Sequence, residues 1–507
     1  MIDEMPYPIP SGWEWATLGD ICQIVRTQID PRLRSKDKFN YLSIENIESN
    51  SGELVDFTPT LGQKIRSPKI AFTTSDVLYS KLRPYLNKVH LPSFDGVSAT
   101  DLIPIRPLGE IPREYVACFL RTRYVVEYAN QKTRGIQLPR IPVDEVLNLP
   151  VPVSPLPEQE RIVAKLGSSL KSIRIARKAL VKVPSLLKVL RRSILAKAFR
   201  GELTERDLKD EPADKLLERI KQQRRSKWED DLRAKGKDPK KYKYREPAPP
   251  DIAQLPALPG GWVWTNFDAL LSDARYGTSQ KCTAKAVGVP VLRIPNIVKG
   301  SLDLEDLKYS EFTNEETERL RVQVGDLLVC RTNGSLDLVG RSAVVGNRGH
   351  VFIFASYLIR LRPVLSEFLP DYLNLLLASP IGRNRIEGKA RTTAGQYNVN
   401  LLTLRSLPVP LPPFGELKRI VGKVREQLGH AEEIQRAVEV AQDRVDTLEQ
   451  SILAKAFRGE LVPQDPNDEP ASVLLERIRA QRAATGKKGR FQTQLELVSP
   501  AKTTSKA

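Results

Sequence analysis

The residues best placed to do chemistry on their own are two acidic side chains and a lysine in the second half of the chain. Pro370-Asp371 followed by Glu387-Gly388-Lys389 has the order of a motif whose two carboxylates hold magnesium for phosphodiester hydrolysis. Such carboxylates normally lie on adjacent strands, whereas the residues that follow Asp371 have the apolar spacing of a helix. We therefore interpret the match as a coincidence and rank a stand-alone nuclease last among the candidate functions.

Other catalytic patterns are missing from the sequence. It contains no GxxxxGK[ST] phosphate loop, no strand-borne GxGxxG, no Asn/Asp-Pro-Pro-aromatic motif and no GxSxG elbow. The four cysteines and three histidines are scattered, so neither a disulfide framework nor a zinc site is expected. The sequence thus predicts no catalytic centre, no metal site and no cofactor in this chain.

Composition favours a nucleic-acid partner. The chain has 507 residues, of which 41% are hydrophobic and 28% charged, a profile of a soluble protein with two to four domains. Its formal charge of +18 predicts attraction to a polyanion. No apolar run approaches the roughly 18 residues that span a bilayer, and no secretory signal is seen at the N-terminus. We therefore expect a cytoplasmic protein that binds nucleic acid and not a membrane.

The chain repeats itself. Residues 193–203 recur without a change at residues 451–461, an offset of 258, and several shorter matches on either side keep that offset. The segments between these blocks are repeated only in outline, as where Gly12-Trp13-Glu14-Trp15 is answered by Gly261-Trp262-Val263-Trp264. A well-kept framework that carries two unlike modules suggests that the framework sets the geometry while each module reads something different.

The repeated blocks are predicted to be long helices. Apolar residues recur every seven positions, with companions three positions further on, a pattern typical of coiled coils. The recurring residues are Leu166, Ile173, Leu180, Leu187 and Ile194 in the first block and Val424, Ala431, Val438, Val445 and Ile452 in the second; the companions are Ala176, Val183, Leu190, Ile434, Ala441 and Leu448.

Two such helices, each preceded by a globular domain, suggest an intramolecular antiparallel pair with pseudo-two-fold symmetry and the domains at opposite ends of a rod. Pro184 is expected to kink or break the first helix. Residues 158–200 carry twelve Lys/Arg against two Asp/Glu, and residues 416–458 carry eight of each. The basic surface of the first helix is either a solvated face or a site for a partner or the DNA backbone.

The predicted fold class is α+β, with two α/β recognition domains separated by the two long helices. The boundaries are 1–150 for the first recognition domain, 151–234 for the first repeated helical region, 235–259 for a Lys/Pro-rich linker, 260–408 for the second recognition domain, 409–482 for the second helical region and 483–507 for a disordered tail.

These features resemble the specificity subunits of Type I restriction-modification enzymes. The resemblance rests on the Gly-Trp-x-Trp start of each half, the Leu-Pro-x-Pro-x-x-Pro run at 149–155, the Glu-Gln-x-Arg-Ile-Val helix start at 158–163 and the twice-repeated Ser-Ile-Leu-x-x-Ala-Phe-x-Gly-Glu-Leu ending. It covers nearly the whole chain. In the second half Gly415-Glu416-Leu417-Lys418 stands in place of the Glu-Gln pair, which weakens any fixed role for Gln159.

The resemblance implies a subunit that is not itself an enzyme. Each recognition domain would read one half of a bipartite double-stranded DNA target, and the coiled coil would set the distance between the half-sites. Two methyltransferase subunits would dock on the helices and methylate adenine at N6 with S-adenosylmethionine. Two motor-nuclease subunits, with ATP and magnesium belonging to them, would complete the restricting complex in a prokaryotic cytoplasm.

Two loops in each half are candidates for DNA contact, because Arg bonds guanine and Gln or Asn bonds adenine at base edges. One follows a predicted strand and the other bears a glutamine. The candidates are Lys81, Arg83, Tyr85, Arg134 and Gln137 in the first half and Arg331, Thr332, Asn333, Lys389, Arg391 and Gln396 in the second. Because the two sets differ, we expect unlike half-sites and a target that is not a palindrome.

Two other classes of function remain open from the sequence. One is the specificity protein of another restriction or phage-defence system, paired with a different methyltransferase. The other is a coiled-coil scaffold that binds DNA without sequence preference, for which binding falls with salt equally on all DNA.

Overall fold

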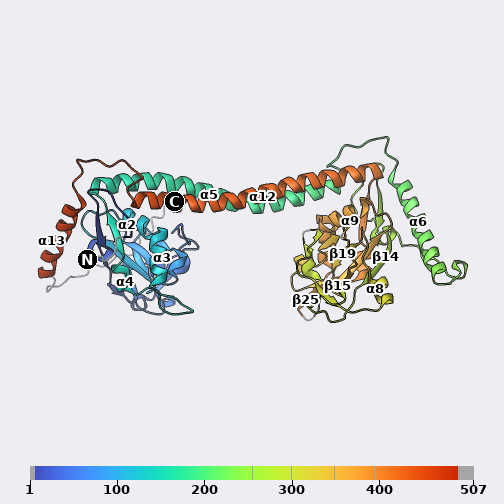
Figure 1. The fold of residues 1–507 in the computed structure, drawn as a ribbon, viewed down its shortest axis with the longest axis horizontal. Helices are drawn as coiled ribbons and strands as arrows, with labels where there is room; N and C mark the ends of the chain where they lie inside the picture. The colour runs from blue at the N-terminus through green and yellow to red at the C-terminus, as the bar shows by residue number, and fades with distance from the viewer. Residues whose placement is uncertain (1–5, 254, 299, 348, 394, 489–507) are drawn as a thin grey trace. The chain divides into compact units, whose positions relative to one another are not determined.

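The computed structural model describes residues 6–488, apart from residues 254, 299, 348 and 394. The chain forms two compact units (Figure 1). The first unit takes the N-terminal segment up to Val181 and the C-terminal segment from Val438; the second takes Lys182–Ala437. Each unit therefore combines parts of both sequence repeats. None of the described helices is long and apolar enough to cross a bilayer.

The first domain (residues 6–153) is built on two four-stranded sheets, in the orders β2-β11-β8-β9 and β3-β7-β10-β5. Helices pack on the first of these sheets, and their apolar faces share its core. The elements are β1 (Glu14–Thr17), α1 (Leu18–Ile21), β2 (Cys22–Ile24), β3 (Gln28–Ile29), β4 (Lys38–Phe39), β5 (Tyr41–Leu42), β6 (Thr60–Leu61), β7 (Lys69–Phe72), β8 (Val77–Ser80), β9 (Val89–His90), β10 (Gly96–Ser98), β11 (Leu102–Pro107), α2 (Arg113–Leu120), α3 (Arg123–Gln131), α4 (Val143–Leu147) and β12 (Pro150–Val153).

The second domain (residues 260–411) repeats this plan with its own strand lengths. Its main sheet has the order β14-β23-β19-β21, and a three-stranded sheet has the order β18-β15-β22. The elements are β13 (Val263–Asn266), α7 (Phe267–Leu270), β14 (Leu271–Tyr276), β15 (Val289–Leu292), β16 (Ile297–Val298), β17 (Ser301–Leu302), β18 (Lys308–Ser310), α8 (Asn314–Leu320), β19 (Leu327–Cys330), β20 (Thr332–Asn333), β21 (Ser342–Val344), β22 (Ile353–Phe354), β23 (Leu358–Pro363), α9 (Leu369–Ala378), α10 (Pro380–Lys389), β24 (Arg391–Thr393), β25 (Gln396–Asn398), α11 (Leu401–Arg405) and β26 (Pro408–Leu411).

Each domain is tied to the long helix that follows it. The strand entering the domain pairs antiparallel with the strand leaving it, β1 with β12 and β13 with β26. The leaving strands contain prolines, which these two-stranded ribbons accommodate because no further strand needs the missing N–H. At the helix start the Trp13 indole N–H donates to Glu158 Oε2 at 2.9 Å, and Trp262 donates to Glu416 at the same distance. Burial raises the pKa of both carboxyl groups, and the tryptophan bond opposes this rise.

The Trp262–Glu416 hydrogen bond shows that the second helix start keeps a glutamate that the sequence comparison had treated as lost. Glu416 occupies the place of Glu158, so the second repeat keeps the glutamate; it differs where Leu417 replaces Gln159 and Lys418 replaces Glu160. The Gln159 amide donates to the Ser154 carbonyl at 2.8 Å in a fully buried position. Leu417 fills the equivalent place with apolar surface.

The long helices α5 (Leu156–Ala198) and α12 (Phe414–Phe457) lie side by side and antiparallel within each unit (Figure 1). In the first unit Leu166, near the start of α5, shares a core with Leu453, near the end of α12. In the second unit Ile194 shares a core with Val424, so the opposite ends of the two helices meet there. α5 continues through Pro184 without a break.

Equivalent ion pairs lie inside each of the two units, and in each unit the pair joins one sequence repeat to the other. Arg161 pairs with Asp468 in the first unit and Arg419 pairs with Asp210 in the second, both at 2.6 Å, and these residues are related by the offset of 258. The ending of each repeat thus packs on the domain of the other half. This exchange is the physical basis of the pseudo-two-fold arrangement.

Only one of the two heptad stripes is consistently buried between α5 and α12. The residues at the recurring position are buried, except that three are half-buried: Leu180, Val445 and Ile452. Several companions are exposed instead: Ala176, Leu190, Ile434 and Leu448. The intramolecular contact is therefore narrower than a full two-position coiled-coil seam, and apolar surface remains exposed on both helices.

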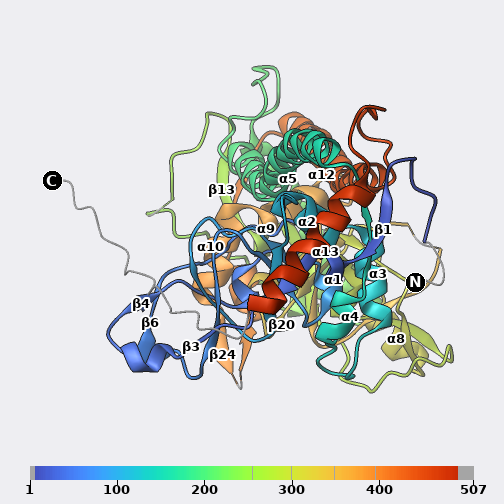
Figure 2. The same ribbon diagram turned by 90° about the vertical axis from the view of Figure 1, so that its left-hand side faces the viewer.

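A further helix follows each long one and packs on a domain. In the second unit α6 (Ala213–Ala234) contacts α7 and β14, and the linker residue Tyr244 packs on Trp228 of α6. In the first unit α13 (Ala471–Lys488) lies against α1 (Figure 2). α13 extends beyond residue 482, where the tail was expected to begin; residues 489–507 of that tail lie outside the described residues.

We expect Phe457→Ala to destabilise the first unit strongly. Phe457 is buried and makes edge-to-face contacts of 5.1 Å with both Tyr115 and Phe119. Truncating such a side chain costs about 3–5 kcal/mol, measurable by urea unfolding of the full chain. Leu448→Ala, on the same helix but half exposed, is the matched control and should cost under about 1 kcal/mol. Equal losses in the two variants would contradict this packing.

Candidate nucleic-acid interface

In the first domain one candidate loop leaves β8 and turns sharply. Lys81 follows the last residue of β8, and Arg83 has a left-handed backbone with φ of 51°. The short turn of residues 84–86 then presents Tyr85 to solvent. A non-glycine residue in this backbone region carries strain that the surrounding structure must hold, a feature often found at functional loops.

The second candidate loop is a short hairpin. The N–H groups of Arg134 and Arg140 each donate to the carbonyl of the other, at 2.8 and 2.9 Å. Gly135, with φ of 91°, makes the reversal that a side chain would strain. Arg134 and Gln137 are both exposed on the hairpin.

The structure brings these two loops of the first domain together. The Arg83 N–H donates to the Pro139 carbonyl at 2.8 Å, and the Ile141 N–H donates to the Lys81 carbonyl at 3.0 Å. Asp101, which the sequence reasoning did not single out, anchors the junction. Its two carboxylate oxygens accept from Arg140 at 3.1 Å each, and the Lys81 ammonium lies 3.6 Å away. The two loops therefore form one projecting surface, named here the first reading surface (residues 81–86 and 134–140).

The second domain joins its two loops in the same way but with more strand structure. β20 pairs with β25, which pairs with β24, so the segment after β19 and the glutamine loop form one small sheet. The Thr332 hydroxyl donates to the Gln396 side-chain oxygen at 3.1 Å, and the Arg331 guanidinium lies 4.8 Å from the Tyr276 ring centre. This is the second reading surface (residues 331–333 and 391–398).

The remaining candidates of the second domain lie at its edge. Asn333 is half-buried in β20, and Lys389 is the exposed last residue of α10. Arg391 begins β24, where its backbone pairs with Asn398; its side chain lies outside what the structure describes. The two surfaces thus share a construction and carry different side chains.

Ion pairs with buried aspartates, which the sequence reasoning did not predict, lie beside the main sheet of each domain. Asp76 accepts from Arg106 at 2.7 Å in the first domain, and Asp326 accepts from Arg362 at 2.7 Å in the second. The second domain adds Arg360, whose side chain is 1% exposed and pairs with Asp273 at 2.6 Å. Desolvation lowers the pKa of this guanidinium, and the carboxylate partly restores it. The aspartate that recurs directly before β8 and β19 was the sequence signal that could have indicated these ion pairs.

The residues of the apparent magnesium motif are engaged elsewhere. Asp371 lies in α9 and pairs with Arg425 at 2.5 Å, while Glu387 lies in α10 and pairs with Arg383 at 2.8 Å. Both carboxylates are therefore on helices and already paired with arginines. Within the described part of the chain, no three His, Cys, Asp or Glu side chains form a group that could hold a metal ion.

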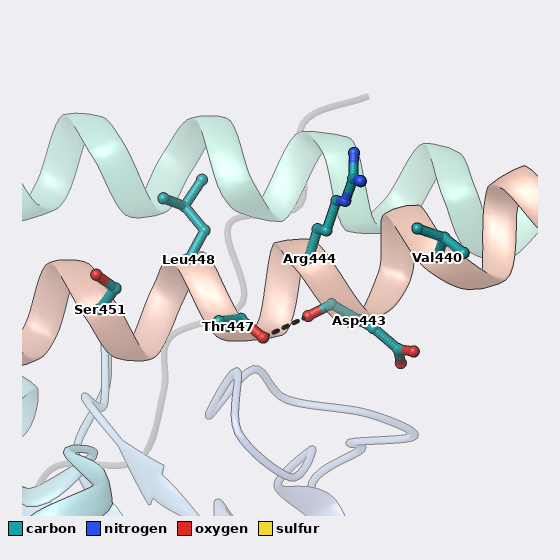
Figure 3. A pocket seen from close by; sticks show the side chains of 6 residues that line it. All are labelled: Val440, Asp443, Arg444, Thr447, Leu448 and Ser451. Carbon is teal, nitrogen blue, oxygen red and sulfur yellow. Dashed lines mark hydrogen bonds between the residues drawn. The ribbon is translucent and has the colours of Figure 1, made fainter.

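The exposed apolar stripe on α12 forms part of a shallow groove in the first unit. The groove is lined by Val440, Asp443, Arg444, Thr447, Leu448 and Ser451. In Figure 3 Leu448 points toward α5 and away from the loops of the first domain. Ile175 and Val181 are further exposed apolar side chains on α5 in the first unit.

Comparison with known proteins gives a consistent set of relatives. Residues 10–184 match a family described as "Type I restriction modification DNA specificity domain". The chain is 28% identical over 511 residues to the Type I restriction enzyme EcoKI specificity subunit of Escherichia coli K12, covering 95% of this chain and 97% of that protein. It is 26% identical to the StySPI specificity subunit of Salmonella potsdam, with the same two coverages.

Two solved structures share the fold. One, described as the structural basis of complex assembly and conformational transition of the type I R-M system, aligns over 90% of this chain with a TM-score of 0.66 and 22% identity. The other, the HsdS subunit from Thermoanaerobacter tengcongensis, aligns over 91% of this chain with a TM-score of 0.53 and 22% identity. Each alignment covers the whole of the other chain.

We expect Asp101→Asn to loosen the first reading surface without unfolding its domain. The Asp101–Arg140 pair is partly exposed, so the free energy of unfolding should fall only slightly. Amide hydrogen exchange at Arg134 and Arg140 should nevertheless accelerate, because the anchor of the hairpin is lost. Glu127→Gln, which breaks an exposed pair with Arg123 on α3, is the control. Unchanged exchange at the two hairpin amides would show that Asp101 is not the anchor.

Proposed function

Because the chain belongs to the family of Type I restriction-modification specificity subunits, we propose that it reads an asymmetric, bipartite DNA target with one half-site for each domain. It is the specificity component of such a system and not a catalytic one.

One observation carries the proposal: both domains join two separate loops into a single reading surface, and the two surfaces carry different side chains. Exposed Arg134 and Gln137 have the donors and acceptors that pair with guanine and adenine edges in the major groove. Arg331, Thr332 and Gln396 offer a different set in the second domain. Unlike surfaces on a repeated framework favour unlike half-sites.

The long helices serve this function as the frame between the domains and as the docking site for partners. Within each unit, α5 and α12 pair through one stripe and leave apolar surface exposed. We assign this surface to the modification subunits, one on each repeat, which would supply S-adenosylmethionine-dependent adenine N6 methylation. Two motor-nuclease subunits, with ATP and magnesium, would complete the restricting complex. The complex would act in the cytoplasm of a prokaryotic cell, where its DNA lies.

A modified-base map of the host genome, with this gene intact and deleted, tests the proposed function. The proposal predicts that deletion removes one bipartite, non-palindromic N6-methyladenine motif. An unchanged map in a host that expresses the modification subunit would contradict the proposal. DNA binding by the purified chain that falls with salt equally on all sequences would instead favour a non-specific scaffold.

Leu448→Glu should prevent the modification subunit from binding while leaving the chain folded. Leu448 lines the groove and is 50% exposed, so the added carboxylate stays hydrated in the free chain but is desolvated under an apolar partner. Co-purification and size-exclusion chromatography measure the loss. Lys455→Glu adds the same group on α12 outside the groove and should retain the partner. Normal co-purification of the Leu448 variant would place the docking site elsewhere.

A further inference from the structure

The first reading surface ends in an apolar side chain that no part of the described structure covers. Ile136 lies at the tip of the 134–140 hairpin with a relative exposure of 101%. Single exposed apolar residues are ordinary on protein surfaces. Ile136, however, stands between two exposed polar candidates for base reading, Arg134 and Gln137, on a hairpin that is firmly held at its base.

The hairpin is built to hold its tip outward. Mutual backbone bonds close it at Arg134 and Arg140, and Asp101 fixes Arg140 through two hydrogen bonds of 3.1 Å. The neighbouring loop contributes Tyr85, which is itself half exposed. Because backbone bonds hold the hairpin at its base, its tip should lose less conformational entropy on meeting DNA than the tip of an unheld loop would.

The second domain lacks this feature at the corresponding place. Gly135-Ile136-Gln137 is answered by a segment in which Gly395 replaces the isoleucine. In addition, the side-chain oxygen of Gln396 already accepts a hydrogen bond from the Thr332 hydroxyl at 3.1 Å. Among the described residues of the second reading surface, Gly395 therefore offers no apolar side chain at the place of Ile136.

We propose that Ile136 recognises the 5-methyl group of a thymine in the first half-site, in the same A·T pair whose adenine is read by Gln137. In the major groove an adenine presents the N6 and N7 atoms that a glutamine amide bonds bidentately, and its thymine partner presents a methyl group that only apolar side chains contact favourably. Adjacent Gln and Ile residues on one tip match these two features of one base pair. The inference rests on the proposed function and adds one specificity-determining residue to it.

The test uses duplexes that carry the motif found by the genome map, with each thymine in turn replaced by 2′-deoxyuridine in both half-sites. Affinities of the full chain with its modification subunits are measured by fluorescence anisotropy at one salt concentration. At one thymine, removal of the methyl group should weaken binding roughly threefold to tenfold, the effect of losing one buried methyl contact. Ile136→Ala should weaken binding to the thymine duplex by a similar factor and show no further loss on the deoxyuridine duplex.

Two controls keep the result interpretable. Leu33→Ala removes another highly exposed apolar side chain of the same domain and should bind both duplexes as the wild type does. Circular dichroism and thermal unfolding of Ile136→Ala should match the wild type, because the side chain has no packing to lose. Thymines of the other half-site should show no dependence on Ile136.

Several outcomes overturn the inference. A first half-site without an A·T pair does so, as does an Ile136→Ala variant that binds like the wild type. Equal weakening of the variant on thymine and deoxyuridine duplexes would indicate a wedge between bases instead of methyl recognition. In all three cases sequence-specific binding persists and the proposed function stands. If the wild-type chain shows no sequence preference at all, the proposed function fails and this inference fails with it.

Discussion

A buried glutamate at the start of each long helix receives the indole N–H of a tryptophan at the entrance of each domain, and the rest of the architecture depends on this contact. The bonds Trp13–Glu158 and Trp262–Glu416 join the first and last residues of a domain to the helix that orients it. Each glutamate is desolvated, which raises its pKa, so losing the tryptophan would leave a buried acceptor unsatisfied. The candidate side chains are placed by loops, whereas this junction holds the entrance of each domain against the start of the long helix that follows it.

The second constraint is the exchange of repeat endings between units. Phe457 packs on the first domain and Phe199 packs on Tyr372 of the second, each at the end of the long helix from the other repeat. The first domain is therefore completed by C-terminal residues far away in sequence. This closure explains why the repeat ending is kept without a change while the domains diverge: the ending must fit equivalent sites, whereas the loops need not match.

Much of the frame was predictable, because its signals are local and periodic. The heptads of residues 166–194 and 424–452 predicted the long helices, and the apolar spacing after Asp371 predicted α9. The division between α2 and α3 depends on Thr122, whose side chain caps the second of these helices. The exposed companions such as Leu448 were not predictable as surface, because a heptad pattern does not distinguish an intramolecular partner from another chain.

The reading surfaces were predictable only in part. The loops were predicted because one follows a strand and the other bears a glutamine that both repeats share. That the two loops of a domain lie together depends on contacts between residues far apart in the sequence. Asp101 is distant in sequence from Lys81 and from Arg140, and no pattern in the chain links the three. The buried Arg360–Asp273 pair has no counterpart in the first domain's sequence pattern and emerged only from the packing of β14 against β23.

The most direct test of independent half-site reading is a comparison of the methylation motifs produced by Gln137→Ala and Gln396→Ala. Each variant replaces the glutamine of one reading surface and leaves the junction of its domain with the long helix intact. Our account predicts that the first variant relaxes the motif in one half-site only and that the second relaxes it in the other half-site only. Relaxation of both half-sites by one variant, or of the same half-site by both, would contradict it.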